Sequence, residues 1–176
     1  EMCIRDRYSQ SGTPTLRVDT QWSADTNQYI VDIEQQIPCH KQQANPQPYL
    51  IPVNIALFDR DGQALELQLQ NCSANGAESM LLTVTEYQQR FVFEDIKTQP
   101  IPSFLQNFSA PVKLDYDYSV EDYTLLMAHE KDTFNRWDAG QRFATEWMLN
   151  AIEALMTNAE IERADAYVEA LKMSIS

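Results

Sequence analysis

The spacing of apolar residues changes near Ser119 and divides this sequence into two parts. From Leu16 to Ser119, apolar residues recur at every second position, which places alternate side chains on one face of a β-strand. After Ser119 they recur at every third or fourth position, the spacing of an amphipathic α-helix. The sequence therefore predicts a β-rich part followed by a helical part.

The β-rich part is predicted to hold about seven short strands. The clearest alternating stripe is Ile51, Val53, Ile55 and Leu57. The same alternation recurs at 16–22, 29–33, 65–69, 82–84, 91–93 and 112–118. Segments rich in turn formers separate the strands at 24–27, 46–48, 71–79 and 100–102. Short strands without intervening helices favour an antiparallel β-sandwich of the immunoglobulin-like kind over a parallel sheet.

The segment Asp59-Arg60-Asp61-Gly62 lies between the stripe at 51–57 and the alternating residues at 65–69. Asp and Gly tolerate the positive φ of a tight turn, so these two strands are predicted to form a β-hairpin. The segment also resembles the start of a calcium-binding loop. The later acidic ligands and the closing Glu of such a loop are missing, which favours the turn.

Ser119 and Asp122 are spaced as a capping pair for a helix that begins at Val120. Two or three helices are predicted from the apolar residues that follow, which are Leu126, Phe134, Trp137, Ala144, Trp147, Met148, Ala151, Leu155, Ala166, Val168 and Leu171. Two amphipathic helices cannot cover their own apolar stripes. We expect them to pack on the sandwich or on further helices that follow this chain.

Charge and cysteine content restrict the partners and the compartment. The net charge of -13 opposes binding to nucleic acid and to anionic membranes, because both require clustered Lys and Arg. No apolar run approaches the roughly 20 residues that span a bilayer, and no signal peptide is evident. Cys3, Cys39 and Cys72 are odd in number and lack C-x-x-C spacing, which favours reduced thiols in the cytoplasm. Residues 1–7 join no pattern and are interpreted as a scar of sequencing or cloning.

His129-Glu130 begins a pattern that could be H-E-x-x-H, in which two imidazoles one helical turn apart bind zinc. The fifth position is Thr133, so the second imidazole is missing, and His129 is interpreted as a solvated residue on a helix surface. Cys39-His40 could pair a nucleophile with a base. Adjacent side chains on an extended chain point to opposite sides, so a loop without catalytic role is favoured.

Two further groups could form a site. Asp115, Asp117, Glu121 and Asp122 could pair as general acid and base, although these positions favour a solvated face. The aromatic residues Trp137, Phe143 and Trp147 could stack on a ligand, although their helical spacing favours the core. No catalytic, cofactor-binding or metal-binding residue is therefore assigned in this chain.

Several strings resemble the bacterial alanyl aminopeptidase (aminopeptidase N) family of zinc metallopeptidases. Tyr8 to Pro14 is similar to the linker that leaves the catalytic domain, and Phe108-Ser109-Ala110-Pro111-Val112-Lys113-Leu114 is similar to the last sandwich strand. The segment 132–139, with Arg136-Trp137-Asp138, resembles the first long helix after the sandwich. Phe91-Val92-Phe93 and Gln99-Pro100-Ile101-Pro102 fit between them. The resemblance extends from Tyr8 to about Ala154.

The resemblance implies a parent with an N-terminal β-domain, a zinc domain, a small β-sandwich and a large helical C-terminal domain. This chain would supply a linker at 8–14, the immunoglobulin-like sandwich at 15–118 and the start of the helical domain at 119–176. In that family zinc is held by H-E-x-x-H and a later Glu, and G-A-M-E-N binds the substrate amine. Neither string occurs here. The expected function is a non-catalytic segment of a zinc-dependent aminopeptidase, whose partners are the catalytic zinc domain and the remaining helical domain of the same chain.

Two other functions remain open from the sequence. A free-standing β-sandwich interaction module with a helical tail is compatible with the architecture alone. A small hydrolase is less favoured, because no nucleophile and base converge in the sequence. Gly12 and Pro14 could fix a sharp path at the junction with the zinc domain, or they could belong to a flexible linker.

Overall fold

The computed structural model describes residues 12–38, 47–72, 76–159 and 164–175. The chain divides into two compact units. The sandwich unit comprises Glu1–Asp59 and Ala64–Asp117, and the helical unit comprises Arg60–Gln63 and Tyr118–Ser176. Each unit is built around its own apolar core.

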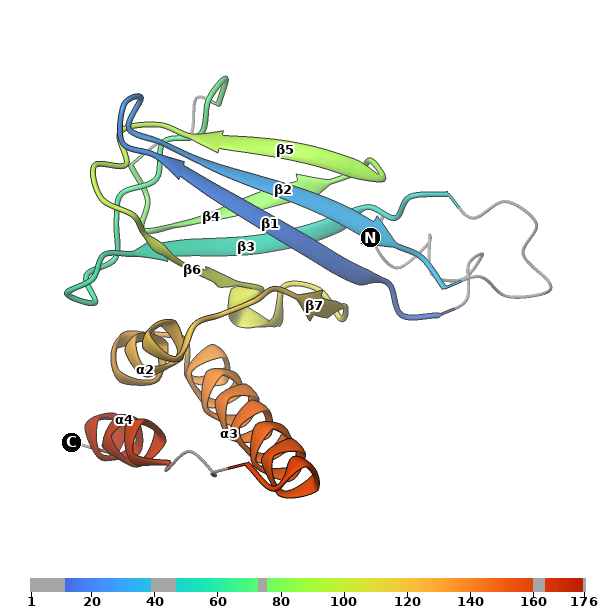
Figure 1. Ribbon diagram of the computed structural model, residues 1–176. Coiled ribbons are helices and arrows are strands. Elements are labelled where there is room, and N and C mark those ends of the chain that lie inside the picture. Colours follow the sequence, from blue (N-terminus) through green and yellow to red (C-terminus); the bar gives the residue numbers. More distant parts are fainter. Residues whose placement is uncertain (1–11, 39–46, 73–75, 160–163, 176) are drawn as a thin grey trace. The chain divides into compact units, whose positions relative to one another are not determined.

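The sandwich unit contains two sheets (Figure 1). The four-stranded sheet has the order β5-β2-β1-β7 and contains β1 (Thr15–Ser23), β2 (Gln28–Gln36), β5 (Gln88–Phe93) and β7 (Lys113–Asp115). The three-stranded sheet has the order β4-β3-β6 and contains β3 (Ile51–Phe58), β4 (Ser79–Val84) and β6 (Ile101–Phe104). All pairings are antiparallel except that of β1 with β7. The prediction of an immunoglobulin-like sandwich, with seven strands among the described residues, is confirmed.

Alternation along the strands produces the core of the sandwich unit. In β2 every second residue from Tyr29 to Gln35 is buried, while the residues between them are half-buried. The central strand β3 buries six of its eight residues, and its Ile51, Ile55 and Leu57 have no exposed surface. Each such side chain contributes about 1.5–3 kcal/mol on burial, which exceeds the contribution of a surface ion pair.

The predicted hairpin between β3 and 65–69 forms only next to the turn, where Phe58 and Ala64 make an isolated antiparallel bridge. Residues 65–69 form no regular strand and make isolated bridges instead, Leu67 with Ala77 and Leu69 with Phe93. The hydrogen bonds of the backbone explain why no strand forms. The Leu65 amide donates to the Leu57 carbonyl, whereas the Leu67 amide donates to the Ala77 carbonyl. The segment changes partners within a few residues, so no ladder with β3 can extend.

A strand also lies where a connection was predicted. Ile101–Phe104, which includes Pro102, forms β6. Proline lacks the amide donor of a ladder, but β6 is an edge strand and bonds to β3 on one side only, so the ladder continues. In contrast, the predicted strand at 112–118 is reduced to the three residues of β7.

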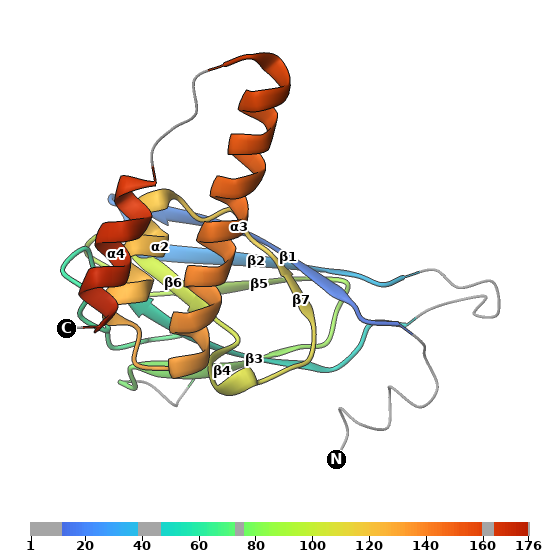
Figure 2. The ribbon, with the colours of Figure 1, turned by 90° about the horizontal axis from the view of Figure 1, so that it is seen from below.

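Three helices are described in the helical unit: α2 (Val120–His129), α3 (Thr133–Thr157) and α4 (Asp165–Ile175) (Figure 2). The predicted capping pair is present, since the Asp122 amide donates to Ser119 Oγ and the Ser119 amide donates to Asp122 Oδ2, both at 3.1 Å. Asp132 caps α3 by accepting from the Asn135 amide at 2.8 Å. Within the described residues, no helix is long and apolar enough to cross a membrane.

Aromatic contacts join the three helices. The ring of Tyr123 in α2 stacks on Phe143 in α3 at 5.6 Å between centroids, and the rings of Tyr167 in α4 and Phe143 meet edge to face at 5.4 Å between centroids. The Tyr123 hydroxyl donates to Glu146 Oε1 at 2.5 Å. Phe143 is therefore the centre of this small core.

The turn Arg60–Gln63 belongs to the helical unit and packs on α2. Gly62 has φ +79° and is buried, and a Cβ added there would overlap the imidazole ring of His129. Arg60 Nη1 lies 3.9 Å from Asp122 Oδ1 at the other end of α2. The backbone conformation favours glycine at position 62, and the His129 ring would have to shift to admit a Cβ there.

Substitution of Gly62 tests this packing. Gly62→Ala should destabilise the helical unit by about 2–4 kcal/mol, because a positive φ and a steric overlap add. Gly76→Ala is the matched control: Gly76 has φ +89° with nothing near its Cβ position, and its cost should be only about 1 kcal/mol. Urea unfolding of the chain gives both values. Adding His129→Ala to Gly62→Ala should recover the steric part, and no recovery would contradict the proposed overlap.

The buried amide of Gln35 provides a second test. Gln35 Nε2 donates to the Tyr49 carbonyl at 2.8 Å, and its Oε1 accepts from the Tyr49 amide at 2.9 Å. Gln35→Leu would leave both backbone groups buried without these partners, so we expect a loss of about 2–4 kcal/mol. Gln36→Leu, on the exposed neighbour, should change stability by less than about 0.5 kcal/mol. Equal effects of the two substitutions in urea unfolding would show that the Gln35 bonds contribute nothing specific.

Candidate functional site

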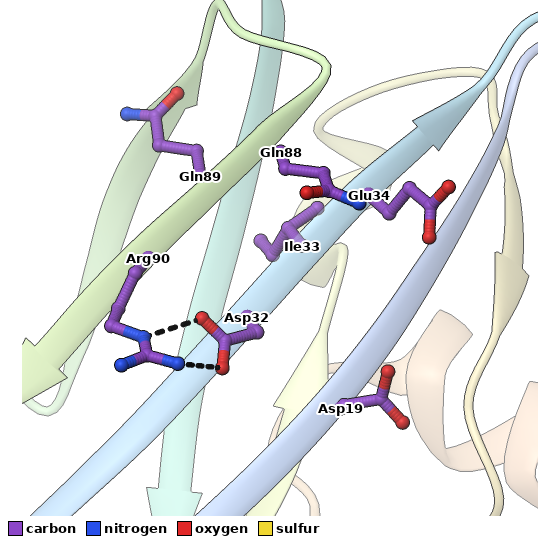
Figure 3. Close-up of a pocket in the computed structure, with 7 residues that line it drawn as sticks. All are labelled: Asp19, Asp32, Ile33, Glu34, Gln88, Gln89 and Arg90. Carbon is purple, nitrogen blue, oxygen red and sulfur yellow. Dashed lines mark hydrogen bonds and ion pairs between the residues drawn. The ribbon is translucent and has the colours of Figure 1, made fainter.

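A surface hollow of the sandwich unit lies over β1, β2 and β5 and has a volume of about 330 Å³ (Figure 3). Its lining is polar and contains Asp19, Asp32, Ile33, Glu34, Gln88, Gln89 and Arg90. The strand register explains this composition. Asp19 lies opposite Asp32, and Asp32 lies opposite Arg90, so these three residues form a row across the sheet.

Arg90 and Asp32 form a bidentate pair in this hollow. Arg90 Nε and Nη2 donate to Asp32 Oδ1 and Oδ2 at 2.7 and 2.8 Å (Figure 3). The hydrogen bond and the charge of Asp32 raise the pKa of Arg90 above its ordinary value. Two carboxylates directly opposite each other repel, and this repulsion is offset by Arg90 at Asp32 and by Arg17, whose Nε lies 3.8 Å from Asp19 Oδ2. The row therefore has a structural explanation without a ligand.

A hollow of about 300 Å³ also lies in the helical unit. It is lined by Met127, Thr133, Arg136, Trp137, Gly140, Gln141, Tyr167 and Leu171. Apolar side chains dominate, and Arg136 is the only charged residue among them. This lining offers no paired acid and base, and it holds no imidazole or thiol.

His129 is exposed at the last position of α2, as predicted for a helix-surface histidine. Glu130 leaves the helix with ψ 126°, and Thr133 is the first residue of α3. His129 and the fifth position of the motif therefore lie on different helices. Glu130 is 1% exposed and its carboxylate accepts from the Asp132 amide at 2.9 Å, so it fixes the turn between the helices. The pattern of apolar residues gave no signal for the burial of this carboxylate.

The other candidates do not converge. Asp115, Asp117 and Glu121 are exposed, and Asp122 caps α2. Asp59-Arg60-Asp61-Gly62 forms the predicted turn, and the antiparallel pairing beyond it is limited to the bridge between Phe58 and Ala64. In the described part of the chain, no group of three or more His, Cys, Asp or Glu side chains is placed to hold a metal ion.

The aromatic residues differ in burial. Phe143 is 5% exposed, as predicted for the core, and Trp147 is half-buried. The prediction that Trp137 belongs to the core is wrong, because 58% of its surface is exposed. Helical spacing indicates which residues share a face, but it does not indicate how far the covering partner extends.

Some of the residues considered from the sequence lie outside the described residues. These are Cys39-His40, Cys3, residues 1–7 and the first part of the 8–14 linker. Cys72 is a free thiol. At the end of the linker, Gly12 has φ 103° and the Pro14 carbonyl accepts from the Lys113 amide at 3.0 Å.

Comparison with known families matches both units. Residues 12–117 match the family described as "Domain of unknown function (DUF3458) Ig-like fold". Residues 120–176 match the family described as "Domain of unknown function (DUF3458_C) ARM repeats". The two matches meet where the spacing of apolar residues changes.

Relatives named aminopeptidase N share much of this sequence. The chain is 42% identical over 138 residues to aminopeptidase N of Escherichia coli, which covers 78% of this chain and 15% of that protein. It is 40% identical over 172 residues to aminopeptidase N of Haemophilus influenzae, with 94% of this chain and 19% of that protein covered. The chain therefore spans less than a fifth of the length of these relatives.

A solved aminopeptidase structure is also similar to this chain. The crystal structure of Legionella pneumophila aminopeptidase A in complex with aspartic acid superimposes with a TM-score of 0.73 at 30% identity, over 96% of this chain and 18% of that one. The resemblance to proteins of the aminopeptidase N kind is thereby confirmed. The chain belongs to the family of the DUF3458 Ig-like fold, and it is similar to a segment of proteins named aminopeptidase N.

Proposed function

We propose that this chain is a non-catalytic structural segment of a zinc-dependent aminopeptidase that removes N-terminal amino acids from peptides. The main support is the similarity to proteins named aminopeptidase N. The similarity covers both the sandwich unit and the helical unit of this chain but only 15–19% of those proteins. Peptide hydrolysis is then performed by other parts of the polypeptide. This segment supplies spacing and rigidity between them.

Each part of the chain then corresponds to a segment of the parent enzyme. Residues 8–14 are the linker from the catalytic zinc domain, 15–118 are the sandwich, and 119–176 begin the C-terminal helical domain. The partners are those two domains of the same chain, and peptide substrates interact with the parent only. The acidic net charge supports a protein that binds neither nucleic acid nor membranes. The free thiol of Cys72 is compatible with a location in the cytoplasm.

Zinc belongs to the parent in this proposal, where it would activate the attacking water. The described residues of this chain hold no group of three His, Cys, Asp or Glu side chains placed for the metal. Zinc in such sites requires several His, Cys or carboxylate ligands that converge on one point. The chain has two histidines, and the helix position that should supply the second imidazole beside His129 is Thr133 on another helix.

The second half of α3 supports a continuing helical domain. An apolar stripe with helical spacing there is at least half exposed, and it consists of Met148, Leu149, Ile152, Leu155 and Met156. Armadillo-type repeats stack so that each repeat buries the apolar face of its neighbour. The match of residues 120–176 to ARM repeats fits a stripe that the next helices cover.

The purified chain should bind no zinc tightly and hydrolyse no aminoacyl amide. The full-length parent, purified in parallel, should bind zinc and hydrolyse the aminoacyl amide. It should lose this turnover when a chelator removes the metal. Chromogenic aminoacyl amide hydrolysis and metal analysis provide the two measurements. Zinc-dependent turnover by the 176-residue chain itself would refute the non-catalytic assignment.

The gene offers an independent test against the interaction-module alternative. An in-frame H-E-x-x-H upstream of Tyr8 is expected if the chain belongs to a zinc aminopeptidase. A start codon at this position, or an unrelated domain before it, would favour a free-standing sandwich module instead.

A further inference from the structure

The sequence of β4 is of the kind that tends to pair with further strands. β4 lies at the edge of the three-stranded sheet, beside β3 (Figure 1). It reads SMLLTV, with no charged residue and no Pro or Gly. Its Leu81 is 59% exposed. Natural proteins usually protect such an apolar edge strand, because its open backbone is a template for strands of other molecules.

The strand register shows which backbone groups of β4 face outward. Thr83 lies opposite Pro52, which has no amide hydrogen to donate. Leu81 lies opposite Asn54, whose amide donates to the Ser109 hydroxyl instead. Hydrogen-bonded and non-hydrogen-bonded pairs alternate along antiparallel strands. The backbone groups of Leu81 and Thr83 therefore face away from β3.

The side chain of Gln89 occupies part of this outward edge. Its Nε2 donates to the Thr83 carbonyl at 3.2 Å, and its Oε1 accepts from the Thr85 amide at 2.9 Å. Gln89 lies on β5 and shares a strand face with the buried Phe91 and Phe93, so its side chain points towards the other sheet.

These two bonds imitate the pairing of a strand. The amide of Gln89 donates to one residue and accepts from the residue two positions further on, as a peptide group of a neighbouring strand does. Gln89 therefore takes the place of an added strand at Thr83 and Thr85.

The edge at Leu81 has no such cover within the described residues, where no backbone group from outside the β3–β4 pair bonds to it. A second copy of the chain would pair here about a two-fold axis, with Leu81 of each copy opposite Thr83 of the other. This ladder needs the Thr83 carbonyl and the Thr85 amide. The Gln89 side chain already uses both groups.

We propose that Gln89 is an edge-protecting residue, which prevents a second copy of this chain from adding to β4 through Leu81 and Thr83. The protection acts on the backbone of β4 and not on its side chains. It is independent of the proposed role in an aminopeptidase, since it requires only the sandwich unit.

Gln89→Ala in the 176-residue chain tests the proposal. Loss of the amide frees the Thr83 carbonyl and the Thr85 amide, so the dissociation constant of a dimer should fall about tenfold or more. Both bonds of Gln89 are exposed, and water replaces them in the monomer, so the variant should remain folded. Sedimentation velocity at several concentrations measures the association. Gln88→Ala, on the exposed preceding residue of β5, is the matched control and should associate no more than the unsubstituted chain.

A second substitution locates the contact. Leu81→Lys places a charge on the open edge, so its addition to Gln89→Ala should restore the monomer. Hydrogen exchange provides a separate measurement, because the Leu81 amide should exchange more slowly in the associated Gln89→Ala variant than in the unsubstituted chain. Association through the exposed stripe of α3 would be equal in all variants and would leave the exchange of this amide unchanged.

An unchanged dissociation constant in folded Gln89→Ala would overturn the proposal, as would association that Leu81→Lys leaves intact. Gln89→Asn is a second variant in case Gln89→Ala unfolds. Its amide is one methylene too short to bond to both backbone groups, so it should associate more strongly than the unsubstituted chain, and a failure to do so would also overturn the proposal.

Discussion

Burial of apolar residues on β3 is the interaction on which the sandwich unit depends. β3 is the central strand of its sheet, and Ile51, Ile55 and Leu57 have no exposed surface. Burial of these residues is worth more than the surface ion pairs of the unit, including the bidentate pair of Arg90 and Asp32. The polar row on the four-stranded sheet can therefore vary in sequence without loss of the fold. The segment that follows β6, in which Leu105, Asn107 and Phe108 have positive φ, relies on the same core, since the Ser109 hydroxyl accepts from the Asn54 backbone amide of β3.

The sequence predicted those elements whose pattern is local. Alternation placed β1, β2 and β3 correctly, and Ser119 with Asp122 marked the start of α2. The failures arose where distant partners decide the structure. Residues 65–69 alternate as a strand does, yet their amides bond to separate segments. Pro102 suggested a connection, but an edge position in the sheet tolerates it.

The same distinction applies to the candidate site. The missing second imidazole at Thr133 was evident in the sequence and argued against zinc at His129. The overlap between a Cβ at Gly62 and the His129 ring was not evident, because these residues are far apart in the chain. Nor was the burial of Glu130, which follows from the turn between α2 and α3. Trp137 shows the converse error, since its spacing suggested the core and the described residues leave it largely exposed.

The parallel pairing of β1 with β7 has a consequence for how the protein is made. Thr15 bonds in register with Lys113, so the first and last strands of the sandwich close the sheet together. Such a contact of high sequence separation forms slowly, because a long loop must close before it yields any stabilisation. During synthesis on the ribosome, the edge of β1 stays unpaired until β7 has emerged. Completion of the sandwich must then wait for nearly all of its residues to be translated.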